Sequence, residues 1–164
     1  MNLGNYTSAP SPAILRQIVA EITKKQYLHS NIISELEVLK ESEESDSTNF
    51  RYIRDIGYNP FYVIMLSQKQ IACLKKCSPN ISLYFDATGS IISSIPGQKR
   101  SYLYSIVVKP DQDVPSISVA DMVPTQHTIP RIELFLSTLK REVCLTGQNL
   151  KVNHIETDFS YPLI

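Results

Sequence analysis

The sequence predicts an α/β domain built on a mixed sheet, and the order of its patterned segments carries this prediction. Three strand-like segments follow one another between residues 81 and 122, with connections short enough for an antiparallel meander. A strongly periodic helical segment then leads to a fourth strand-like segment. A crossover of the usual hand would return that strand parallel to the first one and beside it.

The composition limits the classes of protein to which the chain can belong. With 164 residues and 43% hydrophobic content, it can form one ordinary domain with an arm. The 16 basic and 16 acidic residues cancel, so the charge excess of a dedicated nucleic-acid-binding protein is missing. An odd number of cysteines, three, favours neither a disulfide framework nor a structural zinc site. Without a signal-peptide pattern or an apolar run of roughly 18 to 20 residues, we expect an intracellular chain that does not span a membrane.

Residues 1–49 are expected to form a helical arm followed by an acidic linker. Ser11 and Pro12 supply an N-cap and a first-turn proline, and apolar residues recur at helical spacing from there to about Tyr27. A thinner apolar stripe from Ile32 to Leu39 predicts a second, more acidic helix. The arm is a candidate for DNA or partner contacts, although packing of its stripe on the following domain is the simpler interpretation.

Residues 50–78 are expected to precede the core as a separate segment. Asn59-Pro60 marks a turn between two short apolar and aromatic stretches, which predicts a small hairpin. Ser67 and Gln70 have the spacing of a capping box, so we expect a helix over Gln68–Lys76.

The core is expected to occupy residues 79–164 and to begin with an apolar strand, Ile81–Phe85. An Asp-Ala-Thr-Gly corner follows this strand, and Pro96-Gly97 is the residue pair of a type II turn. The next strand, Tyr102–Val108, is apolar on both faces and is therefore expected to be central. A third strand is expected over Ile117–Met122.

The clearest helix in the sequence follows these strands. Apolar residues recur in steps of three and four from Ile129 to Val143, with Pro130 tolerable in the first turn. Gly147 is a plausible stop. A fourth strand then starts at Leu150 and leads to Asp158.

Asp86 and Asp158 are the candidate site residues, because both come near the C-terminal ends of strands that we expect to be parallel neighbours. Neighbouring strands lie about 4.8 Å apart, so both carboxylates would reach one ion cluster. Such oxygen ligands suit Mg²⁺ or Mn²⁺, and two such ions stabilise the attacking and leaving oxygens of phosphodiester displacement. The pattern indicates a nuclease or strand-transfer site, while a turn-forming Asp86 and a helix-capping Asp158 remain open.

Other acidic and histidine residues are weaker candidates. Asp121 and Glu156 are expected to be surface or edge residues. His127 is expected to be a helix-start residue and His154 a strand residue, rather than general bases. Alternation places His154, Glu156 and Asp158 on one face of the last strand.

The segments YFDATGSII, YLYSIVV, MVPTQHTIPRIELFL and ETDFSYPLI together resemble the RNase H-like catalytic core of the DDE transposase and integrase superfamily. The resemblance extends from about Phe50 to the end of the chain. It implies an RNase H-like fold, with Asp86 and Asp158 as the first two catalytic, metal-binding acids. It also implies Mg²⁺ or Mn²⁺ as cofactor, DNA as substrate and partner, and a nuclear location.

Such cores also carry a third carboxylate on a helix after a fifth strand, and no segment before Ile164 matches it. We therefore expect a truncated core that is inactive by itself and is completed by a missing C-terminal half or a homo-oligomer. One alternative is a domesticated, non-catalytic DNA- or protein-binding module. Another is an unrelated α+β domain in which both aspartates are structural.

Overall fold

The computed structural model of the chain describes residues 31–45, 51–77, 81–89, 92, 95–109, 115–147 and 152–157. The chain divides into two compact units, Met1–Leu39 and Lys40–Ile164. The first predicted helix, from Pro12 to about Tyr27, lies outside the described residues. The second is confirmed as α2, Ile32–Ser45, which begins in the first unit and ends in the second. Asn31 caps it, because its Oδ1 accepts a hydrogen bond of 2.9 Å from the amide of Ile33.

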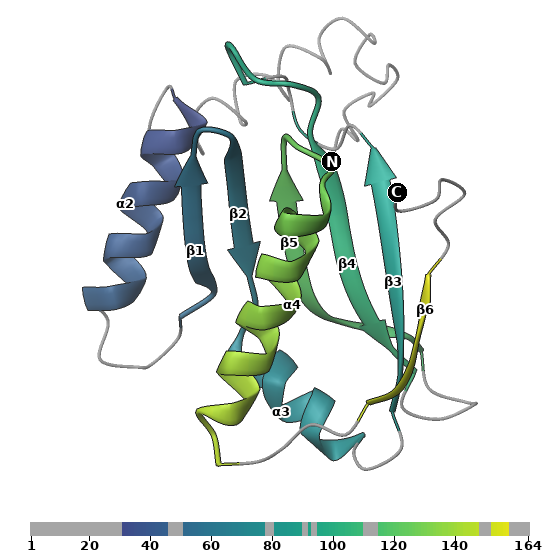
Figure 1. Ribbon diagram of the computed structural model, residues 1–164. Coiled ribbons are helices and arrows are strands. Elements are labelled where there is room, and N and C mark those ends of the chain that lie inside the picture. Colours follow the sequence, from purple (N-terminus) through teal and green to yellow (C-terminus); the bar gives the residue numbers. More distant parts are fainter. Residues whose placement is uncertain are drawn as a thin grey trace, which may run out of the picture. The chain divides into compact units, whose positions relative to one another are not determined.

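The second unit is built on a six-stranded mixed sheet with the strand order β1-β2-β5-β4-β3-β6 (Figure 1). Neighbouring strands are antiparallel except β3 and β6, which are parallel. The strands are β1 Ile53–Tyr58, β2 Phe61–Met65, β3 Ile81–Gly89, β4 Tyr102–Val108, β5 Ile117–Pro124 and β6 Val152–Thr157. The α/β class, the meander of β3, β4 and β5, and the parallel return of β6 are confirmed.

The hairpin of β1 and β2 is confirmed, but it is not separate from the core sheet. Strand β2 pairs with β5 from Tyr62↔Pro124 to Met65↔Asp121, so the hairpin extends the sheet beyond the meander. Phe61, Val63 and Ile64 of β2 are buried, which requires cover on both faces of this strand. The free side of β5 supplies the backbone partners for such a strand.

Helix α4, Ile129–Cys144, lies across one face of the sheet (Figure 1). Helix α3, Gln68–Lys76, has the predicted capping box: Ser67 Oγ accepts from the amide of Gln70, and Gln70 Oε1 accepts from the amide of Ser67. Gln70 Nε2 also donates to the carbonyl of Ser118, at 3.1 Å, which ties α3 to β5. Within the described residues, no helix is both long and apolar enough to cross a bilayer.

The main hydrophobic core lies between α4, α3 and the face of the sheet that α4 covers. Its fully buried large side chains include Tyr104, Phe135, Ile64, Leu66, Ile71, Leu74, Ile106, Met122, Val108, Val119 and Val143. The alternating burial of β4 shows why it is central, since Tyr104, Ile106 and Val108 are all buried on this face.

The turn predicted at Pro96-Gly97 is confirmed, and it connects the hairpin of β1 and β2 to the rest of the sheet. Gly97 has φ +75°, and the amide of Gln98 donates to the carbonyl of Ile95 at 3.0 Å. The Gln98 amide group then makes three hydrogen bonds. Its Oε1 accepts from the amide of Phe61 (3.2 Å) and from Thr125 Oγ1 (3.0 Å), and its Nε2 donates to the carbonyl of Tyr58 (3.2 Å).

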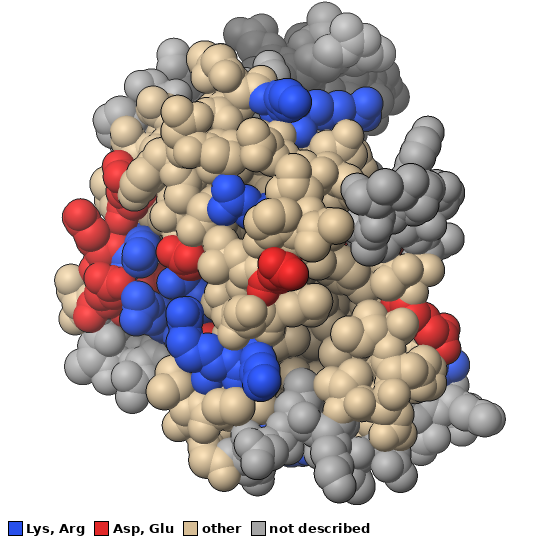
Figure 2. All heavy atoms as spheres, in the orientation of Figure 1, with Lys and Arg blue, Asp and Glu red and all other residues tan. Residues whose placement is uncertain are grey.

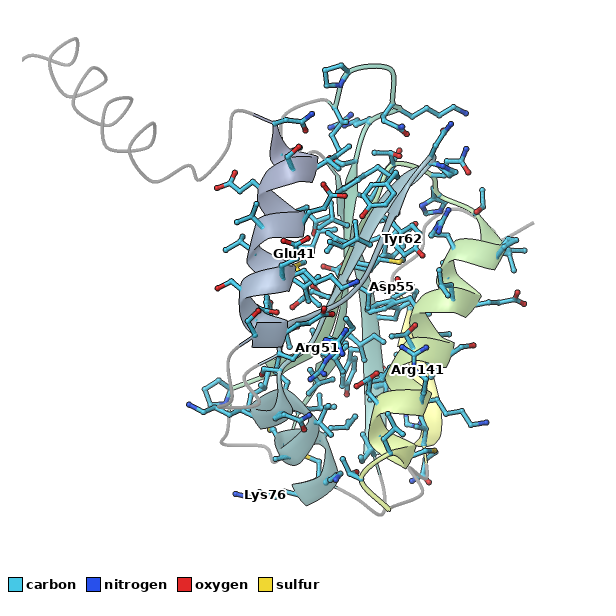
Figure 3. The ribbon with its side chains drawn as sticks, turned by 90° about the vertical axis from the view of Figure 1, so that its left-hand side faces the viewer. Glu41, Arg51, Asp55, Tyr62, Lys76 and Arg141 are labelled. Carbon is cyan, nitrogen blue, oxygen red and sulfur yellow. The ribbon has the colours of Figure 1, made fainter. Side chains whose placement is uncertain are left out.

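The hairpin is also held to α4 by charged and aromatic contacts. Tyr62 Oη donates to Asp55 Oδ2 at 2.9 Å (Figure 3). The guanidinium of Arg131 lies 4.1 Å from the centre of the Tyr62 ring. Arg54 and Glu142 form an ion pair of 3.4 Å whose side chains are only 6% and 12% exposed. Burial lowers the pKa of Arg54, and the carboxylate of Glu142 opposes this shift.

Candidate metal centre

Asp86 lies on the face of the sheet opposite to α4. In β3, Leu83 and Phe85 are buried on the α4 side, where the Phe85 ring lies 6.1 Å from that of Phe135. Alternation along the strand turns Tyr84 and Asp86 to the other face, and both are exposed. The apolar packing of Phe85 therefore fixes the direction in which the Asp86 carboxylate points.

The predicted Asp-Ala-Thr-Gly corner is wrong, because β3 continues through this segment as far as Gly89. Asp86 pairs with Ser105 of β4, and the ladder ends only at Gly89↔Tyr102. Asp86 is thus a strand residue, and the turn-forming alternative for it is contradicted. The local preference of Asp and Gly for turns was overridden by a β4 long enough to pair with the whole segment.

The Asp86 carboxylate is available to a ligand. The Thr88 hydroxyl lies on the same exposed face and donates to Asp86 Oδ2 at 3.4 Å. An exposed carboxylate with a hydroxyl beside it offers the hard oxygen donors that Mg²⁺ and Mn²⁺ prefer. The residues present therefore fit part of such a site.

Asp158, the second predicted ligand, lies outside the described residues. The described part of β6 ends at Thr157, and Thr157 pairs with Phe85 in the parallel register. Phe85 and Thr157 are the residues that directly precede Asp86 and Asp158 in the sequence. The predicted parallel pairing of these two strands is confirmed up to this position.

Asp121 is an acidic residue whose position differs from the one that the sequence predicts. It was expected at the surface or at an edge, but it lies half-buried in β5, between β2 and β4. Its Oδ1 accepts hydrogen bonds from Ser105 Oγ (2.6 Å) and Ser118 Oγ (2.9 Å). The residues on either side of Asp121 were the signal available, since Ala120 and Met122 are buried, pair with the buried Ile106 and Tyr104, and so turn Asp121 to the other face.

The pairings place Asp86, Ser105 and Asp121 in one row across β3, β4 and β5 on the face opposite to α4. Asp86 and Asp121 are two strands apart, which corresponds to about 10 Å between their backbones. Ser105 and Ser118 both donate hydrogen bonds to the Asp121 carboxylate, whereas the Asp86 carboxylate is exposed.

The charge of Asp121 also acts on a neighbouring tyrosine. Burial raises the pKa of Tyr52, and the charges of Asp121 and Glu43 raise it further.

The two histidines with predicted structural roles are not placed to assist Asp86. His127 lies directly before Thr128, the N-cap of α4, as expected, and its Nδ1 is bonded to the hydroxyl of Tyr104. Tyr104 is buried on the α4 face, and burial raises the pKa of its hydroxyl, with Tyr102 adding to the shift. His154 lies on β6 and pairs with Glu156 at 2.9 Å, both exposed, in agreement with their predicted strand and surface roles.

Within the described residues, no group of three or more His, Cys, Asp or Glu side chains is close enough to hold a metal ion. On the face that carries α4, a short run of Lys and Arg side chains lies beside a cluster of Asp and Glu side chains (Figure 2). No protein-family model matches the chain, and neither a curated protein nor a solved structure is significantly similar to it.

Proposed function

We propose that the second unit belongs to a DDE-type nuclease or transposase core, acting on DNA in the nucleus. The order β5-β4-β3-β6, with α4 between β5 and β6, supports an RNase H-like assignment. It is the order expected from the resemblance of the four segments, and the hairpin of β1 and β2 is an addition on the β5 side.

The observation that carries this proposal is the parallel register of β3 and β6. Phe85 pairs with Thr157, each one residue before a predicted acid, and Asp86 is exposed on the face opposite to α4. Two acids that follow paired residues of parallel neighbours would lie about 4.8 Å apart at the backbone. This separation suits two carboxylates that share one or two small cations.

In this proposal each residue has a separate role. Asp86 and Asp158 would hold Mg²⁺ or Mn²⁺, and Thr88 would orient the Asp86 carboxylate through its hydroxyl. The bound ions would supply charge stabilisation for the oxygens of a phosphodiester undergoing displacement. Phe85 would fix the direction of Asp86 by packing on Phe135. The resemblance also implies a third acid, and no group of three His, Cys, Asp or Glu side chains lies together in the described residues; we propose that Asp86 and Asp158 alone do not catalyse the reaction.

Binding of Mn²⁺ to the isolated chain, followed by electron paramagnetic resonance, tests the proposed site. Asp86→Asn and Asp158→Asn should each weaken binding about tenfold or more, at least the loss that removal of a supporting group causes. The Asp86→Ala, Asp158→Ala double variant should abolish it. Glu133→Gln removes one exposed carboxylate from α4 and should leave binding unchanged. If the folded double variant binds Mn²⁺ as tightly as the wild type, Asp86 and Asp158 are not the metal ligands.

The second candidate is a non-catalytic DNA- or protein-binding module derived from such an enzyme. The observation that favours it is the lack of a three-ligand group within the described residues. A module of this kind should bind DNA equally well in the presence of a chelator, and the two aspartate substitutions should not alter its affinity. Loss of DNA binding on removal of divalent ions would instead support the metal-dependent core.

A further inference from the structure

The two outer strands of the sheet differ in how their free edges are protected. Strand β1 carries a bulge between Ile53 and Asp55, and Glu43 Oε2 accepts hydrogen bonds of 2.9 Å from the amides of Tyr52 and Ile53. Both devices prevent another strand from pairing there. Strand β1 is therefore a closed edge.

Strand β6 has the opposite character. It is the outer strand on the other side of the described sheet, and all of its residues from Asn153 to Thr157 are exposed. It contains neither proline nor lysine, the residues that commonly block edge pairing. The ladder irregularity between β3 and β6 lies near Asn153, so the stretch from His154 to Thr157 pairs regularly with β3. Among the described residues, no strand pairs with the outer edge of β6, which is regular from His154 to Thr157.

An apolar groove lies beside this edge on the α4 side. It has a volume of about 380 Å³, and Leu136, Leu139 and Cys144 of α4 form one wall, with Leu83 of β3 and Ile155 of β6 on the other. Ile155 points to the same side as the buried Leu83, with which it pairs, yet it is 45% exposed. Helix α4 thus leaves the apolar side of β6 uncovered.

The side chains of β6 are complementary to a second copy of the same strand. If two β6 strands pair antiparallel about a two-fold axis at Ile155, His154 of each copy faces Glu156 of the other, and the two Ile155 side chains meet. His154 and Glu156 already pair within one copy at 2.9 Å, on the face opposite to Ile155. The dimer would therefore alternate two histidines and two glutamates on one face.

We propose that the chain forms a two-fold dimer through antiparallel pairing of the β6 edges, centred on Ile155. A two-fold axis perpendicular to the sheet keeps both α4 helices on one side, so the two apolar grooves become continuous across the paired Ile155 side chains. The paired edge is short, which places this interface at the small end of specific contacts, and the dimer should form in a concentration-dependent manner. The inference is independent of the proposed metal site.

Cysteine cross-linking tests the register directly. In a Cys144→Ser background, which removes the thiol in the groove, Ile155→Cys should form a disulfide-linked dimer under mild oxidation. Directly opposed residues of antiparallel strands have Cα atoms about 4.5 to 5.5 Å apart, within the range for a disulfide. The matched control is Thr157→Cys, exposed on the same strand, whose two copies would lie about 13 Å apart along the strands. Equal cross-linking at positions 155 and 157 would overturn the proposal.

Charge exchange gives an independent readout by sedimentation of the uncross-linked chain. His154→Glu places two glutamates opposite each other at both ends of the pairing and should weaken dimerisation at least tenfold. The double exchange His154→Glu, Glu156→His restores opposite partners and should recover the wild-type dissociation constant. A monomer at all concentrations, as expected if another segment or protein occupies the edge, would refute the dimer. Failure of the double exchange to recover dimerisation would refute it too.

Discussion

Replacement of Gln98 by alanine tests whether one side chain joins the hairpin of β1 and β2 to the rest of the sheet. The Gln98 amide bonds to Phe61 and Tyr58 at the hairpin turn and to Thr125 at the end of β5. Alanine removes all three bonds while leaving the backbone turn at Gly97 intact. The free energy of unfolding should therefore fall without loss of the fold.

The size of the effect follows from the surroundings of each partner. The amide of Phe61 is partly buried and would lose its acceptor, which costs about 1 to 2 kcal/mol. The Thr125 hydroxyl also bonds to the carbonyl of Phe61 at 3.2 Å and so keeps one partner. The carbonyl of Tyr58 is exposed and can bond to water, so its loss costs about 0.5 kcal/mol. We expect a total of about 2 kcal/mol.

Urea denaturation followed by far-ultraviolet circular dichroism measures this change, since the chain has no tryptophan for fluorescence. Lys99→Ala, at the exposed neighbouring position, is the matched control and should lie within about 0.5 kcal/mol of wild type. Gln98→Glu keeps an acceptor for Phe61 and Thr125 but loses the donor to Tyr58, so its stability should be intermediate. If Gln98→Ala is as stable as Lys99→Ala, the hydrogen bonds of Gln98 do not couple the hairpin to the rest of the sheet.

Two further predictions concern packing and pH. In Gly57→Ala, the added Cβ would lie 1.9 Å from Tyr62 Cε1, so the ring must move away from Asp55 and Arg131; unfolding measurements should show a loss of about 1 to 3 kcal/mol. The same substitution in a Tyr62→Ala background should cost less, and an equal cost in both backgrounds would contradict the clash. Burial raises the pKa of Tyr104 and Tyr52, so above pH about 10 the unfolded state loses phenolic protons that the folded state retains, and stability should fall as the pH rises. In Tyr104→Phe, the free energy of unfolding, measured by denaturation at several pH values, should fall less steeply as the pH rises. A fall as steep as that of the wild type would contradict the role of Tyr104 in it.

The sequence was sufficient for elements whose pattern is local. The steps of three and four from Ile129 to Val143 fixed α4, and the Ser67–Gln70 spacing fixed α3. The order of elements then predicted the parallel return of β6, because a crossover helix of the usual hand leaves few other positions for this strand.

The errors arose where distant segments decide the structure. Pairing of β2 with β5 joins Tyr62 to Pro124, and nothing in either segment alone marks the other as its partner. The extension of β3 through Asp86 to Gly89 depends on the length of β4, while the local sequence resembles a turn. The position of Asp121 between two serines follows from these same pairings, so reasoning from its own segment could not place it beside Ser105.

The geometry of the proposed dimer decides whether one copy can supply a third carboxylate to the proposed metal site of the other. Each metal site would use β3 and β6 of one copy, and a two-fold axis at Ile155 turns the C-terminal ends of these strands in opposite directions. The Asp86 side chains of the two copies would lie three strand spacings apart laterally and about six residues apart along the strands, or about 24 Å in total. A carboxylate near one site therefore cannot complete the other through this interface. His154→Glu alone should therefore weaken dimerisation and leave Mn²⁺ binding unchanged. If Mn²⁺ binding instead follows dimerisation, the two-fold arrangement at Ile155 is wrong.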